Sequence, residues 1–120
     1  MNDEQEIQAT IQTYFDSMYE SNGEKAKLAF HVDAKIVGYL EEELHTMSVT
    51  DFADFVESQR PSPKDKGEAI RLDILSIDIA GKTALAKVRD DYLGMTFLDN
   101  LSLLKSNGKW TIYNLSLIHI

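Results

Sequence analysis

Asp99 is the residue whose surroundings in the sequence most clearly suggest chemistry. Within residues 97–104, the alternation of a β-strand places its carboxyl on the same face as Phe97 and Leu101. Burial among apolar neighbours disfavours the charged form of a carboxyl and raises its pKa, so Asp99 could donate a hydrogen bond as a neutral acid. The alternative is a structural role, in which Asp99 bonds a backbone group at a bulge or faces solvent.

Other reactive groups are few. His31, His45 and His119 lack the close spacing of a metal site, and the chain has no cysteine, so thiolate ligands, disulfides and cysteine nucleophiles are excluded. We therefore expect no metal. The sequence has no glycine-rich phosphate loop and no nucleophile elbow, and we expect no cofactor.

Three helices are predicted from apolar spacing and caps. The first covers residues 3–19, where Asp3 could cap it and Glu6 could complete a capping box. A short helix is expected over residues 24–30, and a third over 49–58, capped by Ser48. The residues expected to face inward from the first and third helices are Ile7, Ile11, Tyr14, Phe15, Met18, Phe52, Phe55 and Val56.

The C-terminal half reads as four antiparallel strands, over residues 69–79, 83–93, 97–104 and 110–118. Asn107-Gly108 supplies the two positive φ angles of a tight hairpin turn between the last two strands. The alternation in the first of these strands changes phase, which predicts a bulge near Leu75-Ser76 or two differently covered faces. A further strand is expected at residues 34–40, followed by a solvated acidic turn at 41–43. Helices and strands are thus segregated, which indicates an α+β fold.

The composition and charge of the chain restrict the classes of partner that it can bind. The chain has 120 residues, 43% of them hydrophobic, and we expect a single domain over residues 1–120. The net charge of −8 disfavours nucleic acid and anionic membranes as partners. The acidic start does not resemble a signal peptide, and no apolar run is long enough to span a bilayer, so a cytoplasmic location is expected.

The pattern resembles the nuclear transport factor 2-like superfamily and, more narrowly, its branch described as "Putative lumazine-binding". The resemblance is carried by Tyr14-Phe15, by residues 28–34, and by the hairpin that runs through residues 99–104 and 108–112. It implies a cystatin-like roll, in which a strongly curved antiparallel sheet wraps around the N-terminal helices as a cone with an apolar pocket. It also implies a homodimer formed through the convex face of the sheet.

The resemblance also has consequences for the site. Ketosteroid isomerases of this superfamily use an acid in the strand of Asp99 and a tyrosine near the position of Tyr14. Gly38 stands where those enzymes carry their catalytic aspartate, so isomerase activity is not expected here. His45, near the expected rim of the pocket, is a second candidate for proton transfer.

Three functions remain open from the sequence. The first is a binding protein for a small apolar or aromatic molecule, and the second is a lyase or isomerase that uses Asp99 or His45. The third is a dimerisation module whose pocket is packed shut by Phe52, Phe55 and Tyr14. The expected ligand-binding residues are Tyr14, Met18, Tyr39, Phe52, Phe55, Phe97 and Asp99.

Overall fold

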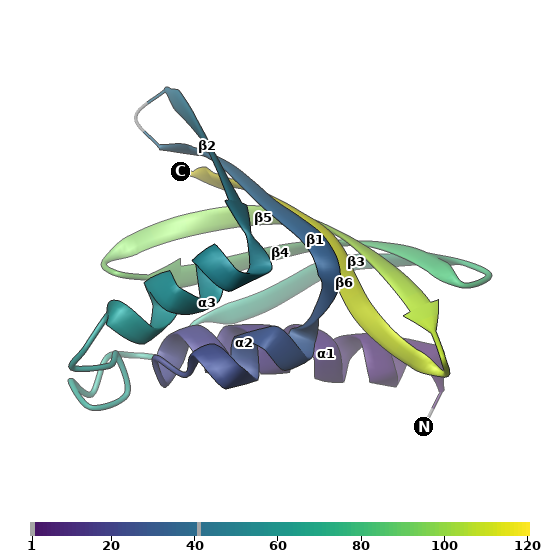
Figure 1. Cartoon of the computed structure of the whole chain (residues 1–120), viewed down its shortest axis with the longest axis horizontal. Coiled ribbons are helices and arrows are strands. Elements are labelled where there is room, and N and C mark those ends of the chain that lie inside the picture. The colour runs from purple at the N-terminus through teal and green to yellow at the C-terminus, as the bar shows by residue number, and fades with distance from the viewer. Residues whose placement is uncertain (1, 41) are drawn as a thin grey trace.

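The computed structural model describes residues 2–40 and 42–120 of the chain (Figure 1). These residues form an α+β fold, as predicted, with three helices and a six-stranded sheet. The elements in chain order are α1 (Asp3–Tyr19), α2 (Gly23–Ala29), β1 (Phe30–Leu40), β2 (Glu43–Ser48), α3 (Val49–Ser58), β3 (Leu72–Ala80), β4 (Thr83–Tyr92), β5 (Met95–Ser106) and β6 (Lys109–His119).

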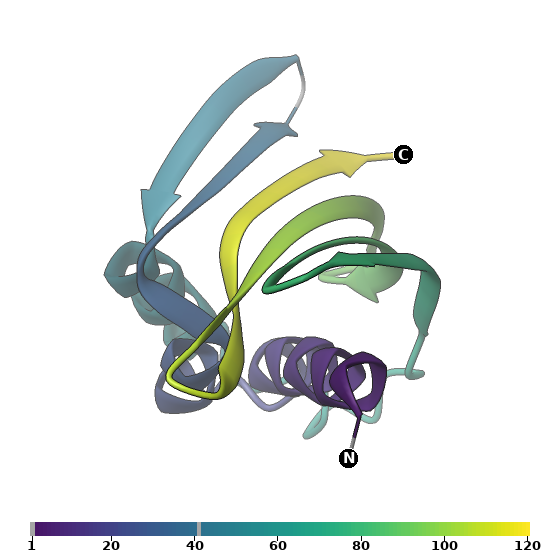
Figure 2. The ribbon, with the colours of Figure 1, turned by 90° about the vertical axis from the view of Figure 1, so that its right-hand side faces the viewer.

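Helix α1 lies in the hollow of the sheet, which curls over it when viewed along the helix (Figure 2). Its buried side includes Ile7, Ile11 and Tyr14, as the apolar spacing predicted. The predicted cap was wrong by one position. Asn2 is the N-cap, and its side chain accepts a hydrogen bond from the Gln5 backbone amide at 2.8 Å.

Asp3, the predicted cap, is drawn instead to the β5–β6 hairpin. Its carboxylate accepts hydrogen bonds from the Trp110 indole at 3.0 Å and from the Lys105 ammonium at 2.9 Å. These bonds to cationic and neutral donors hold the pKa of Asp3 below its ordinary value. The start of α1 is thereby held against the β5–β6 hairpin.

The strand order is β2-β1-β6-β5-β4-β3, and every neighbouring pair is antiparallel except β1 with β6, which run parallel. The four C-terminal strands form the predicted meander. Asn107 and Gly108 both have positive φ, as the tight turn between β5 and β6 requires. Register shifts in three strand pairs mark irregular positions that bend the sheet.

The bulge predicted in β3 is confirmed. The pairing with β4 skips Leu75, so Ile74 opposes Val88 while Ile77 opposes Ala86. The extra residue restores the phase, so Leu72, Ile74, Ile77 and Ile79 all oppose inward-facing residues of β4. The alternative, in which each face of this strand is covered by a different partner, is not needed to explain its sequence.

Strand β2 was not predicted, and β1 begins at Phe30 rather than at residue 34. The two strands form an arm that pairs Lys35 with Ser48 and continues outward to Leu40 and Glu43. The acidic run was expected to be a solvated turn. Glu41 lies outside the described residues, Glu42 is an exposed turn residue, and Glu43 already belongs to β2.

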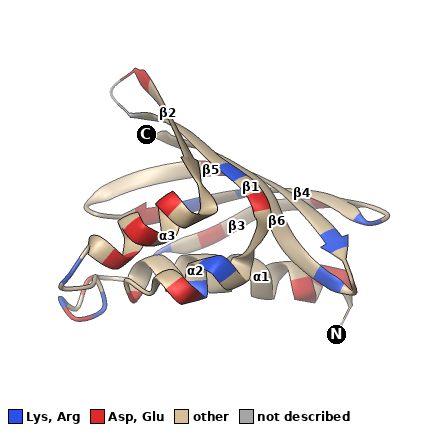
Figure 3. Cartoon of the chain, viewed as in Figure 1, with Lys and Arg blue, Asp and Glu red and all other residues tan. Residues whose placement is uncertain are grey.

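Helix α3 begins and ends where predicted, with a complete capping box between Ser48 and Asp51. Its buried Phe52 meets Tyr14 and Phe30, with ring centroids 6.2 and 5.6 Å apart respectively. These contacts fix α3 beside α1 and leave a space between the two helices and the sheet. Figure 3 shows Lys and Arg scattered over helices, loops and strands. None of the described helices is long and apolar enough to cross a membrane.

Candidate functional site

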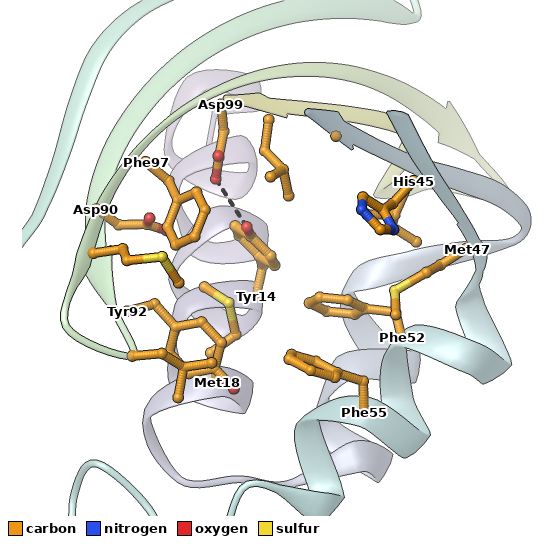
Figure 4. A pocket seen from close by; sticks show the side chains of 15 residues that line it. Tyr14, Met18, His45, Met47, Phe52, Phe55, Asp90, Tyr92, Phe97 and Asp99 are labelled. Atoms are coloured by element: carbon orange, nitrogen blue, oxygen red, sulfur yellow. Dashed lines mark hydrogen bonds between the residues drawn. The ribbon is translucent and has the colours of Figure 1, made fainter. Parts of the chain in front are cut away.

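A cavity of about 300 Å³ opens between α1, α3 and the inner face of the sheet (Figure 4). Tyr14, Phe52 and Phe55 line this cavity and do not pack it shut. The lining residues are Tyr14, Met18, Ile36, Gly38, His45, Met47, Phe52, Phe55, Asp90, Tyr92, Leu93, Met95, Phe97, Asp99 and Leu117.

Asp99 and Tyr14 form the polar centre of this apolar wall. The Tyr14 hydroxyl donates a hydrogen bond of 2.8 Å to Asp99 Oδ2, and both side chains are almost completely buried. Asp99 reaches the cavity from β5 because strand alternation places it with Phe97 and Leu101. Tyr14 reaches it from α1, so the contact joins the sheet to the helix that it encloses.

Burial raises the pKa of the Asp99 carboxyl to about 7, although the hydrogen bond from Tyr14 acts in the opposite direction. Burial also raises the pKa of the Tyr14 hydroxyl, and the charge of Asp99 adds to this effect. Tyr14 is therefore a neutral donor at physiological pH. Asp99 can be either a neutral acid or a carboxylate near neutrality.

Asp90 is a second buried carboxyl, which the sequence analysis did not identify. It lies on β4 and is only 1% exposed. Burial raises its pKa to about 8, and the nearby charges of Asp99 and Asp91 contribute. The signal was available, because Ala84, Ala86 and Val88 face inward and the same alternation continues to Asp90. Arg89 and Asp91 flank it in the sequence, and these charged neighbours made the position look like exposed surface.

His45 faces the cavity from the opposite wall, on the exposed arm strand β2. It is opposite Gly38 in the pairing of β2 with β1. The row continues through Leu117 of β6 to Asp99 of β5. Directly opposed residues project to the same side of a sheet, so the imidazole and the carboxyl share the inner face.

Gly38 is a close-packed position and not an open gap. A Cβ added to it would lie 2.6 Å from Leu117 Cδ1, closer than carbon atoms approach in proteins. A carboxyl side chain at this position would have to displace Leu117. The isomerase-type base is therefore absent at residue 38, and the space it would need is occupied by a leucine.

Most of the predicted binding residues line one cavity, but Tyr39 does not. Its side chain is 52% exposed, and it follows Gly38 on β1, so alternation turns it to the outer face of the sheet. His31 and His119 are also outside the cavity lining. Within residues 2–40 and 42–120, no group of three or more His, Cys, Asp or Glu residues is placed to hold a metal ion.

Comparison with known proteins places this geometry in a family. Residues 2–116 match the family described as "Putative lumazine-binding". The chain belongs to this family. Its fold is that of the nuclear transport factor 2-like superfamily, as the sequence predicted.

Two solved structures are similar to this member of the family. An NTF2-like protein of unknown function from Methylobacillus flagellatus KT is 31% identical, with a TM-score of 0.86 over 98% of this chain and 92% of the other. A domain of unknown function with a cystatin-like fold from Nostoc punctiforme PCC 73102 is 19% identical, with a TM-score of 0.76 over 98% and 77%. The second supports the fold alone.

A curated relative carries an activity in its name. The aldolase FrzH of Cladobotryum sp is 27% identical over 104 residues, which cover 87% of this chain and 81% of the aldolase.

Proposed function

We propose that the protein binds a small, largely apolar or aromatic molecule in the cavity, with Asp99 and Tyr14 fixing its orientation. The observation that carries this proposal is the fully buried Asp99 carboxyl, bonded to Tyr14 at the edge of an open apolar space. An apolar cavity with a few convergent polar groups is the usual form of a small-molecule site. The family description supports the same class of function.

The two carboxyl oxygens of Asp99 have different roles in this proposal. Oδ2 accepts the hydrogen bond from Tyr14, while Oδ1 is buried and has no hydrogen-bond partner among the described residues. A bound molecule would complete the hydrogen bonding of Oδ1. Phe52, Phe55 and Phe97 would contact its apolar part.

Binding can be tested with lumazine, the pteridine in the family description, and with 1-naphthol as a second flat probe. We expect chemical-shift changes in the amides of the cavity residues on titration, and weaker binding by Tyr14→Phe. Tyr19→Phe is the matched control, because it removes a hydroxyl from the same helix. That hydroxyl donates to the Glu68 backbone carbonyl, and Tyr19 does not line the cavity. Titrations that shift no cavity resonance with any flat aromatic probe would refute the proposal.

Proton-transfer catalysis of the lyase or isomerase kind is a second candidate function. It is supported by His45 facing the cavity across from Asp99 and by the similarity to a protein named as an aldolase. In such a reaction His45 or Asp90 would remove a proton beside a carbonyl group. A neutral Asp99, held in place by the hydrogen bond from Tyr14, would donate a hydrogen bond to the developing enolate oxygen.

This candidate predicts exchange of the α-protons of a small aromatic ketone such as 2-tetralone in heavy water, followed by proton NMR. Exchange should be faster with the protein than without it, and slower with His45→Gln or Asp90→Asn. His31→Gln is the matched control, because His31 is outside the cavity lining. Equal rates for the protein and for buffer would leave binding as the function.

We also propose that the protein acts as a homodimer joined through the convex face. The outward residues Leu98, Asn100, Ser102 and Leu104 of β5 carry no charge, and Leu85, Ser116 and Ile118 extend this uncharged strip onto the neighbouring strands. Lys87 and Arg89 of β4 border the strip, opposite Asn100 and Leu98 respectively. Leu85 is 62% exposed and Ile118 is 46% exposed. An uncharged strip with exposed apolar side chains inside a charged border is typical of an interface.

A further inference from the structure

Three buried oxygens at the cavity lack hydrogen-bond partners among residues 2–40 and 42–120. They are Asp90 Oδ2, Asp99 Oδ1 and the Tyr92 hydroxyl oxygen. All three residues line the cavity, and each is less than a tenth exposed. A buried polar atom without a partner is destabilising, so three such atoms on residues that line one cavity point to a partner supplied by a bound molecule.

The two carboxyls are close neighbours on the inner face of the sheet. Val88 is directly opposite Asp99, and Asp90 is two residues further along β4, which makes it the diagonal neighbour of Asp99. Tyr92 follows on the same face of β4, and Figure 4 shows these side chains on one wall of the cavity. All three groups can accept hydrogen bonds, and the two carboxyls can carry negative charge.

The cavity supplies little positive charge to balance them. Among its described lining residues none is Lys or Arg, and His45 is the basic side chain, on the opposite wall. Two carboxylates in an apolar setting repel each other and lose hydration, so the empty site disfavours their charged forms. A bound cation with several N–H groups would reverse this effect.

We infer that the cavity selects small apolar or aromatic molecules that carry a protonated primary amine, whose N–H groups donate to Asp90 and Asp99. This inference rests on the proposed binding function and names its ligand class. An ammonium group has three donors and no acceptor, which matches oxygens that lack donors. Charge-assisted hydrogen bonds of this kind are also stronger than those between neutral groups.

Proton release should accompany binding. Burial raises the pKa of Asp90 to about 8 and that of Asp99 to about 7, so the free pair retains protons near neutrality. A bound ammonium favours both carboxylates and displaces those protons. The other titratable groups that face this space are Tyr14 from α1, Tyr92 from β4 and His45 from β2. A charged His45 would oppose the amine, so a His45→Gln background separates its contribution.

The test compares 1-naphthylmethylamine with 1-naphthylmethanol, which has a hydroxyl in place of the ammonium group. Calorimetry at about pH 8, in two buffers of different ionisation enthalpy, gives affinity and proton release together. We expect the amine to bind at least about tenfold more tightly and to release protons. Asp90→Asn should remove most of this preference, whereas Asp91→Asn, which changes an outward-facing carboxylate one position along β4, should retain it.

The outcomes separate the two proposals. If the amine and the alcohol bind equally, the amine inference fails while the binding function stands. Preference for the amine that survives Asp90→Asn and Asp99→Asn alike would also overturn the inference. If neither probe nor any other flat molecule binds, the binding function itself fails.

Discussion

At the scale of single residues, the cavity is defined by two carboxyls, those of Asp90 and Asp99. Their burial in an apolar wall raises their pKa values to about 8 and about 7. Asp99 could be found from the sequence, because strand alternation places it among apolar neighbours. Its hydrogen bond to Tyr14 joins residues 85 positions apart, and only the family resemblance indicated that pairing. Asp90 escaped notice because it sits between charged residues, although the alternation of β4 points it inward.

The Asp99 carboxyl should titrate near pH 7, well above the ordinary value of about 3.9, because burial disfavours its charge. Carbon-13 NMR of the side-chain carboxyl checks this directly. In Tyr14→Phe the value should rise further, because the hydrogen bond that favours the carboxylate is removed. A titration at or below about pH 4 would show that the carboxyl is solvated.

At the scale of elements, local signals proved sufficient where local chemistry decides the structure. The cap of α3 at Ser48, the turn at Asn107 and the bulge at Leu75 were all predicted correctly. Strand β2 was missed because its side chains are mostly exposed and it pairs only with β1. The parallel pairing of β1 with β6 joins distant segments, and no periodicity in either strand specifies it.

Gly38 links two of these strands, and its substitution tests their packing. Gly38→Ala should destabilise the protein by about 1–3 kcal/mol, because the new methyl group would overlap Leu117. Leu117→Ala in the same chain should recover part of this loss, with a coupling of about 1 kcal/mol or more. Denaturant unfolding of the two single variants and the double variant measures the coupling. Additive effects would mean that Leu117 is not the obstacle.

At the scale of the whole molecule, the sheet presents an inner face that encloses a cavity and an outer face on which β5 carries only uncharged side chains. The outer strip around Leu85 is the proposed dimer interface. Its full extent could not be recognised before the register was known, because its members come from three strands. A symmetric pair of copies would cover the strip on both.

We expect sedimentation to give the mass of a dimer, and Leu85→Glu to give a monomer, because a buried unpaired charge opposes association. Leu28→Glu is the matched control. Leu28 is similarly exposed, at 59% against 62% for Leu85, but lies on α2, away from the convex face. A wild-type chain that sediments as a monomer at all concentrations would contradict the proposed interface.

The buried carboxyls should also set the pH dependence of global stability. The pKa of Asp90 rises to about 8 in the folded chain, so its contribution is fully present below about pH 4 and is lost as pH rises towards 8. Asp90→Asn should flatten this decline. Above pH 8 the variant should be more stable than the wild type by about 1 kcal/mol or more, measured by urea unfolding. A wild type that gains stability from pH 5 to pH 8 would contradict this assignment.

Trp110 gives the protein a built-in optical reporter. It is the one tryptophan in the sequence, it is 2% exposed, and its indole donates to Asp3 at the first turn of α1. It is also absent from the cavity lining. Its fluorescence should therefore change when the start of α1 separates from the β5–β6 hairpin. It should change little when a molecule binds beside Asp99, so the two ends of the enclosed helix can be observed separately.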